Sequence, residues 1–102
     1  MQFMYVLQLN EQYRNESNWS EETEKIISEH FNYLKGLHEK GVMKMVGRTN
    51  YDVAHDENRG IAIFEADNIE QATVIMSNDP CIIKGVMTAK LHPFNIVLYN
   101  GK

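Results

Sequence analysis

The sequence has little cysteine and no long hydrophobic run. Its one cysteine, Cys81, cannot form a disulfide within the chain, and no second thiol is present to complete a cysteine zinc site. No apolar stretch approaches the roughly 20 residues that a membrane-spanning helix requires. The segment after Met1 lacks the basic region that opens a signal peptide. We therefore expect a cytoplasmic protein with no membrane partner.

Positive charge is also scarce, because ten Lys and Arg residues face fourteen Asp and Glu residues, for a formal net charge of −4. The basic residues are scattered, whereas nucleic-acid binding needs a basic patch or stripe that contacts phosphates. This pattern argues against a nucleic-acid partner. With 102 residues, 43% of them hydrophobic and 24% charged, the chain is typical of one globular domain spanning residues 1–102.

The first half of the chain predicts a strand followed by a long helix. Residues 3–9 are aromatic and aliphatic in the manner of a strand, and residues 10–18 form a polar loop. Ser20 is a suitable N-cap, and the three glutamates that closely follow it suit a helix N-terminus. The apolar stripe then recurs at helical spacing up to Gly41, which fits the C′ position with a positive φ.

The middle of the chain predicts two strands and a second helix. Residues 42–47 and 60–66 have strand composition, and the polar residues 48–59 connect them. Asn68, followed three residues later by Gln71, resembles a capping box at a helix start.

The end of the chain predicts a break and a last strand. Pro80 should stop the second helix, and residues 81–85 should form a short turn. The last strand should lie within residues 87–99, where Pro93 indicates an edge position or a bulge. The order β-α-β-β-α-β predicts an α+β ferredoxin-like fold, with a four-stranded antiparallel sheet and two helices on one face.

Both faces of this predicted sheet are apolar. In the first strand, Phe3 and Tyr5 alternate with Met4 and Val6, and the third and last strands show the same pattern. Two helices can cover only one face, and a large uncovered apolar face is an association surface. We therefore expect a homodimer that packs sheet to sheet.

His30 is the most informative single residue. It interrupts the apolar stripe of the first helix, whose other residues are Ile27, Phe31, Leu34 and Leu37. The sequence places Asp79 at the end of the second helix, where the helix dipole disfavours a negative charge. Both helices lie on one face of the sheet, so the two side chains can meet. A carboxylate would orient the imidazole for proton transfer. Alternatively, His30 is a structural histidine bonded to a backbone carbonyl, and Asp79 is a turn residue.

Other candidates carry weaker signals. His38 is eight residues from His30, too far along a helix to share a metal ion, and no histidine pair has metal-ligand spacing, so we expect no metal and no cofactor. Cys81 has aliphatic neighbours that favour a buried, protonated thiol. Arg48, at the end of the second strand, could bind a substrate carboxylate through two hydrogen bonds.

The chain resembles the YciI-like (YCII-related) proteins over nearly its whole length. The matching segments are Met4-Tyr5-Val6-Leu7, His30-Phe31-Asn32-Tyr33-Leu34, Leu37-His38-Glu39-Lys40-Gly41, Gly47, Ile69-Glu70-Gln71-Ala72, Asn78-Asp79-Pro80, Gly85 and Pro93-Phe94. Two positions depart from the family pattern. Arg48 follows Gly47 where relatives commonly have proline, and Cys81 follows Pro80 where relatives commonly carry an aromatic residue. Both changes would alter a pocket wall, so the resemblance does not identify the substrate.

The resemblance implies a dimeric ferredoxin-like α+β barrel in which His30 and Asp79 form the active-site pair. It favours a small-molecule enzyme with general acid–base chemistry, of a lyase, dehydrohalogenase-like or isomerase type. Arg48, Tyr5 and His92 are then candidate residues of the pocket wall. Two alternatives stay open: a non-catalytic dimeric module that binds or senses a small metabolite, and a cofactor-free monooxygenase of the dimeric α+β barrel type.

Overall fold

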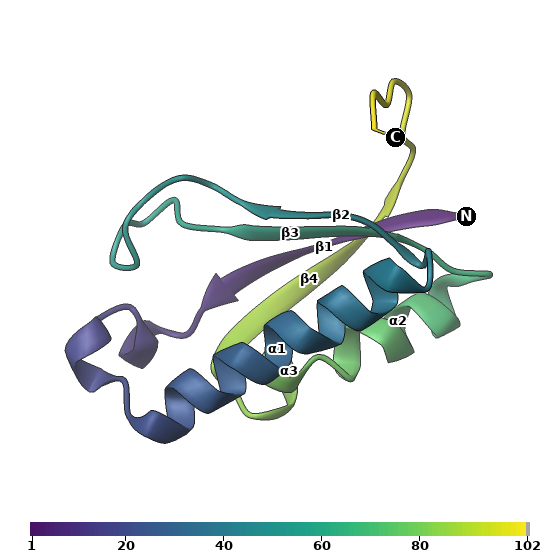
Figure 1. The fold of residues 1–102 in the computed structure, drawn as a ribbon. Helices are drawn as coiled ribbons and strands as arrows, with labels where there is room; N and C mark the ends of the chain where they lie inside the picture. The colour runs from purple at the N-terminus through teal and green to yellow at the C-terminus, as the bar shows by residue number, and fades with distance from the viewer. Residues whose placement is uncertain (102) are drawn as a thin grey trace.

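A computed structural model describes residues 1–101 and has the α+β ferredoxin-like fold that the sequence predicts (Figure 1). The main elements are β1 (Gln2–Leu9), α1 (Glu21–Glu39), β2 (Met43–Arg48), β3 (Gly60–Glu65), α2 (Ile69–Ser77), α3 (Pro80–Ile83) and β4 (Met87–Phe94). Two 3-10 turns, η1 (Glu11–Tyr13) and η2 (Glu16–Asn18), lie in the segment expected to be a loop. The sheet is antiparallel throughout, in the order β2-β3-β1-β4.

The ends of α1 are where the sequence places them. The Ser20 hydroxyl accepts a hydrogen bond from the Thr23 backbone N–H, and the Thr23 hydroxyl accepts one from the Ser20 N–H. Gly41 follows the helix with a φ of +79°, which confirms the expected left-handed position. In the part of the chain that the structure describes, no helix combines the length and the apolar character needed to cross a bilayer.

The region around Asp79 differs from the prediction. The second helix ends at Ser77, and Asp79 is the N-cap of a separate one-turn helix, α3, in the segment expected to be a plain turn. Pro80 takes the first position of α3, where a missing backbone N–H costs no hydrogen bond. The placement of Asp79 at the end of the second helix was therefore wrong, and its carboxylate lies at a favourable helix N-terminus.

The last strand is shorter than the longest range predicted for it. β4 ends at Phe94 because this residue pairs with Gln2, where β1 itself begins, so the following residues have no strand beside them. Val97 and Leu98, expected to belong to a sheet face, are 86% and 93% exposed. Pro93 does lie on an edge strand, as its residue type predicts.

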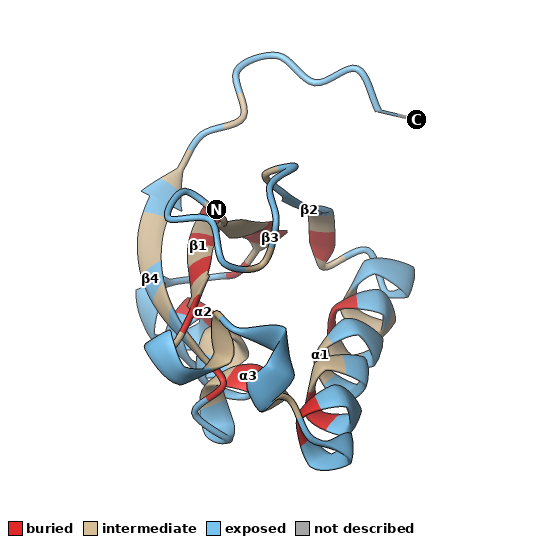
Figure 2. Ribbon diagram, turned by 90° about the vertical axis from the view of Figure 1, so that its left-hand side faces the viewer, coloured by how far each residue is buried: buried red, intermediate tan, exposed pale blue. Residues whose placement is uncertain are grey.

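The core lies between the sheet and the helices, which all cover the same face (Figures 1 and 2). Alternate residues of β1, from Phe3 to Leu9, are buried on this face. The register places Ala62 and Phe64 of β3 beside them. Tyr5 therefore lies at the centre of the core.

The other face of the sheet carries no helix (Figure 1). Alternation and register place an apolar half on this open face, from β1, β2 and β3: Met4, Val6, Met45, Ile61 and Ile63. On β4 the corresponding residues are Thr88, Lys90 and His92. The expectation of an apolar face across the whole sheet was therefore wrong for β4, because the apolar residues beyond Phe94 were counted as part of this strand.

Candidate active site

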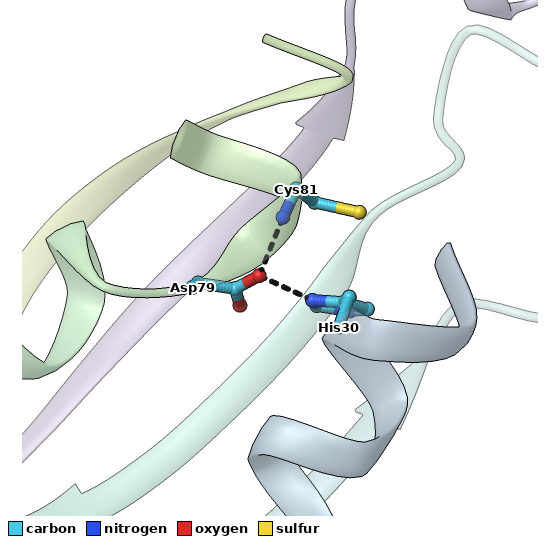
Figure 3. A group of neighbouring side chains, drawn as sticks. All are labelled: His30, Asp79 and Cys81. Atoms are coloured by element: carbon cyan, nitrogen blue, oxygen red, sulfur yellow. Dashed lines mark hydrogen bonds and ion pairs between the residues drawn. The ribbon is translucent and has the colours of Figure 1, made fainter. Parts of the chain in front are cut away.

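The centre of the candidate site is the carboxylate of Asp79, which is completely buried. Its Oδ1 atom lies 2.6 Å from His30 Nδ1 and accepts a hydrogen bond from the Cys81 backbone N–H at 3.0 Å (Figure 3). Its Oδ2 atom accepts a hydrogen bond from the Tyr5 hydroxyl, also at 3.0 Å. Residues from β1, α1 and α3 thus converge on one carboxyl group.

Local sequence explains how these groups meet. His30 lies in the middle of α1, on the side that packs against α3. Asp79 caps α3, and this cap role turns its side chain back toward the Cys81 N–H. The contact between His30 and Asp79 that the sequence interpretation requires is therefore present, although Asp79 reaches it from a helix start and not from a helix end.

The hydrogen bonds also indicate which nitrogen of His30 carries a proton. An ionised carboxylate can only accept hydrogen bonds, and Asp79 receives one at each oxygen from Tyr5 and Cys81. In the contact with Asp79, the Nδ1 atom of His30 is therefore the donor. The Nε2 atom, across the imidazole ring, is left to accept or deliver a proton.

Three neutral acids surround the carboxylate. Burial, followed by the charge of Asp79, raises the pKa of the Tyr5 hydroxyl far above its usual range. The same two causes raise the pKa of the Tyr33 hydroxyl and raise that of the Cys81 thiol to about 12. Cys81 is therefore protonated at neutral pH and is not a ready nucleophile, in agreement with its expected place in the core.

His30 lines a cavity of about 610 Å³ between the helices and the sheet. This volume lies within the range of ordinary small-molecule sites. Most of the wall is apolar and includes Trp19 and Phe31. Four charged or polar side chains also reach the wall: Glu16, His30, Arg48 and Asn58.

The other residues predicted for the pocket wall are distributed differently. Arg48 lines the cavity and makes no ion pair with any residue in the range 1–101. Tyr5 is not on the wall but is buried beside Asp79. His92 lies on the open face of the sheet, in a second cavity of about 280 Å³, because strand alternation points it away from the helices.

Sequence reasoning missed much of the wall. Phe31 was assigned to the buried stripe of the first helix, yet it is 60% exposed and faces the cavity. Glu16 and Asn58 come from segments that were treated only as polar connections, and Trp19, directly after the first of these segments, was given no role. The one available signal was Trp19, since a large aromatic side chain directly after a polar loop needs a surface to cover.

The site also contains the residue types of a metal centre. Potential ligand atoms of His30, Asp79 and Cys81 lie within 4.8 Å of one another. However, the imidazole and the carboxylate are joined directly at 2.6 Å, and a metal-binding cysteine would have to lose a proton that burial holds firmly. In this arrangement the three residues fit a hydrogen-bonded group better than a metal site.

Comparisons with known proteins agree with this architecture. The YCII-related domain family matches residues 1–95 of the sequence. Among solved structures, the chain is similar to 5-chloro-2-hydroxyhydroquinone dehydrochlorinase from Burkholderia phenoliruptrix AC1100, in complex with 2,5-dihydroxybenzoquinone, with a TM-score of 0.68 and 18% identity. The match covers 93% of this chain and 94% of the other. No curated protein matches the sequence significantly.

Proposed function

Because this chain belongs to the family of YCII-related domain proteins, we propose that it is a small-molecule enzyme that uses His30 and Asp79 for general acid–base chemistry. The observation that carries the proposal is the 2.6 Å contact between His30 Nδ1 and Asp79 Oδ1, with the same imidazole on the wall of a cavity. A histidine that is both held by a buried carboxylate and open to a ligand site has the arrangement of a general base.

In the proposed reaction, His30 Nε2 removes a proton from a carbon atom of the bound substrate. Asp79 stabilises the imidazolium that forms, and Arg48 holds an anionic oxygen of the substrate. In a lyase the electron pair of the broken C–H bond forms a double bond, and a leaving group departs. In an isomerase the proton returns at another carbon. The dehydrochlorinase named above supports the first version, since its reaction releases chloride.

Deuterium exchange tests this proposal without requiring the natural substrate. A panel of small acidic carbon compounds, including hydroxylated quinones and 5-chloro-2-hydroxyhydroquinone, is incubated with the protein in D₂O and followed by NMR. We expect catalysed exchange or elimination with at least one compound. General acid–base catalysis contributes about 10²- to 10⁴-fold in rate, so His30→Ala should lose about this factor.

The control for this assay is His55→Ala, because His55 is exposed in the connection between β2 and β3 and takes no part in the cavity. Equal rates for the wild type and His30→Ala would refute the catalytic role. Ligand binding without exchange, elimination or oxygen uptake would instead indicate a binding or sensing module. Oxygen uptake with quinols would indicate a cofactor-free monooxygenase.

We also propose that two copies associate through the open face of the sheet. The apolar half of that face carries no helix, and apart from the buried Ile63 its residues stay partly or fully exposed. The apolar residues after Phe94 extend on the same side of the sheet, away from the helices (Figures 1 and 2). A second copy would remove both surfaces from water. The single free cysteine agrees with the further proposal that this assembly works in the cytoplasm.

Sedimentation analysis at micromolar concentration tests the dimer. Val6→Asp places a charge on the open face and should yield monomers, whereas Val74→Asp, at an exposed position of α2, should leave the assembly unchanged. A wild-type protein that sediments as a monomer would refute the proposal.

A further inference from the structure

The hydroxyl of Tyr5 has no part in the chemistry described so far. Tyr5 is completely buried in β1, and its hydroxyl donates to Asp79 Oδ2 at 3.0 Å, on the opposite oxygen from His30. A buried phenol could have been a phenylalanine at lower desolvation cost. The presence of the hydroxyl therefore indicates that its hydrogen bond to Asp79 has a role.

We propose that Tyr5 is a positioning residue that shares the Asp79 carboxylate with His30 and thereby limits how tightly His30 holds a proton. This inference rests on the proposed acid–base function, and it gives Tyr5 the role of adjusting the proton affinity of His30. A general base works best when it gives up its proton near the working pH, so a carboxylate that stabilised the imidazolium too strongly would keep the base occupied.

Two hydrogen bonds fix the orientation of the Asp79 carboxylate. The Cys81 N–H fixes Oδ1 and the Tyr5 hydroxyl fixes Oδ2, so the carboxylate cannot rotate about its bond to the side chain without losing a buried hydrogen bond. Oδ1 is consequently held toward His30 Nδ1. Without the Tyr5 hydroxyl, only one oxygen would be fixed.

The Tyr5 hydroxyl also affects the balance of charge between Asp79 and His30. The Tyr5 hydroxyl donates to the other oxygen of Asp79, and it stabilises the anion most when His30 is neutral, because a protonated imidazole already offsets much of the carboxylate charge. When this donor is removed, the buried anion depends more on the imidazolium. His30 should then retain its proton to a higher pH. A hydrogen bond to a charged group is strong enough to move the titration midpoint by about 0.5 to 1 pH unit, a three- to tenfold change in proton binding.

Other groups near His30 are left unchanged by the substitution. Glu16 and Arg48 line the same cavity and carry opposite charges. The Cys81 thiol is neutral over the titration range of histidine, since burial raises its pKa to about 12. The Tyr33 phenol is also neutral there, because burial raises its pKa. A difference between the wild type and Tyr5→Phe therefore reports on the shared carboxylate.

The test is an NMR titration of the histidine rings in the wild type, Tyr5→Phe and Tyr33→Phe. Tyr33→Phe is a matched control, because its hydroxyl donates to the Ile75 carbonyl at 2.6 Å and not to Asp79. We expect the His30 midpoint to rise in Tyr5→Phe and to stay unchanged in Tyr33→Phe. The other three histidines serve as internal references.

An unchanged or lower His30 midpoint in folded Tyr5→Phe would overturn the inference. If Tyr5→Phe fails to fold, uniform 3-fluorotyrosine labelling keeps every side chain in place and makes the phenol a stronger donor. The His30 midpoint should then fall, and a midpoint that stays constant or rises would overturn the inference. Neither titration needs a substrate, so failure of the deuterium-exchange assay would refute the catalytic role separately from the link between Tyr5 and His30.

Discussion

Replacing Asp79 with alanine should destabilise the fold strongly, because one carboxylate satisfies three buried or part-buried donors. Asp79→Ala leaves the Tyr5 hydroxyl, the Cys81 N–H and His30 Nδ1 without an acceptor. Each unsatisfied buried donor costs about 1–3 kcal/mol, so the low end for three is about 3 kcal/mol. That is a large share of the roughly 5–15 kcal/mol by which domains of this size are stable.

Urea unfolding at pH 7, followed by the fluorescence of the single tryptophan and by circular dichroism, measures this loss. Asp79→Asn retains an acceptor for the Cys81 N–H and should lose less than Asp79→Ala. Asp52→Ala is the matched control, since Asp52 is exposed and should change the free energy of unfolding by less than about 0.5 kcal/mol. A loss below about 1 kcal/mol for Asp79→Ala would contradict the hydrogen-bond arrangement and its estimated cost.

Three further predictions concern the thiol, alkaline pH and the cavity. Cys81 is completely buried and should resist alkylation by iodoacetamide at pH 8 in the native protein but react fully in urea; rapid native labelling would contradict its burial. Because burial raises the pKa of Cys81 to about 12, the folded protein keeps this proton to higher pH than the unfolded chain does. The free energy of unfolding should therefore fall above about pH 9, by up to about 1.4 kcal/mol per pH unit from this group. Cys81→Ala should flatten this slope in urea titrations between pH 9 and 11. Arg48→Gln should weaken the binding of an anionic ligand about tenfold, measured by the fluorescence of Trp19 in the same cavity, and an unchanged affinity would remove Arg48 from the site.

The order of elements could be predicted from the sequence because it depends on local signals. Ser20 and Gly41 carry their cap preferences in their own chemistry, and both lie at the ends of α1 as predicted. The end of β4 could not be predicted in the same way. Residues 95–99 have strand-like composition, but a strand needs a neighbour, and β1 begins opposite Phe94.

The candidate site was predicted in part for the same reason. The sequence identified His30 because a titratable side chain on an apolar stripe is locally unusual. It did not identify the role of Tyr5, since its partner Asp79 is 74 residues away and an aromatic residue in a strand has an ordinary explanation in the core. The position of His92 could have been predicted from the alternation of side chains along β4, because His92 pairs with Met4 of β1, which lies on the open face.

The elements that hold Asp79 are largely different from the segments that form the cavity wall, and this separation affects how the ligand specificity could change. Asp79 is held by side-chain and backbone groups of β1, α1 and α3. Much of the cavity wall comes instead from η2, Trp19, β2 and the β2–β3 connection. Substitutions in those peripheral segments can change the shape of the cavity while Asp79, His30 and α3, which Asp79 caps, stay intact. Mutation could therefore change which ligand the cavity accepts while the His30–Asp79 pair that we propose as catalytic stays in place.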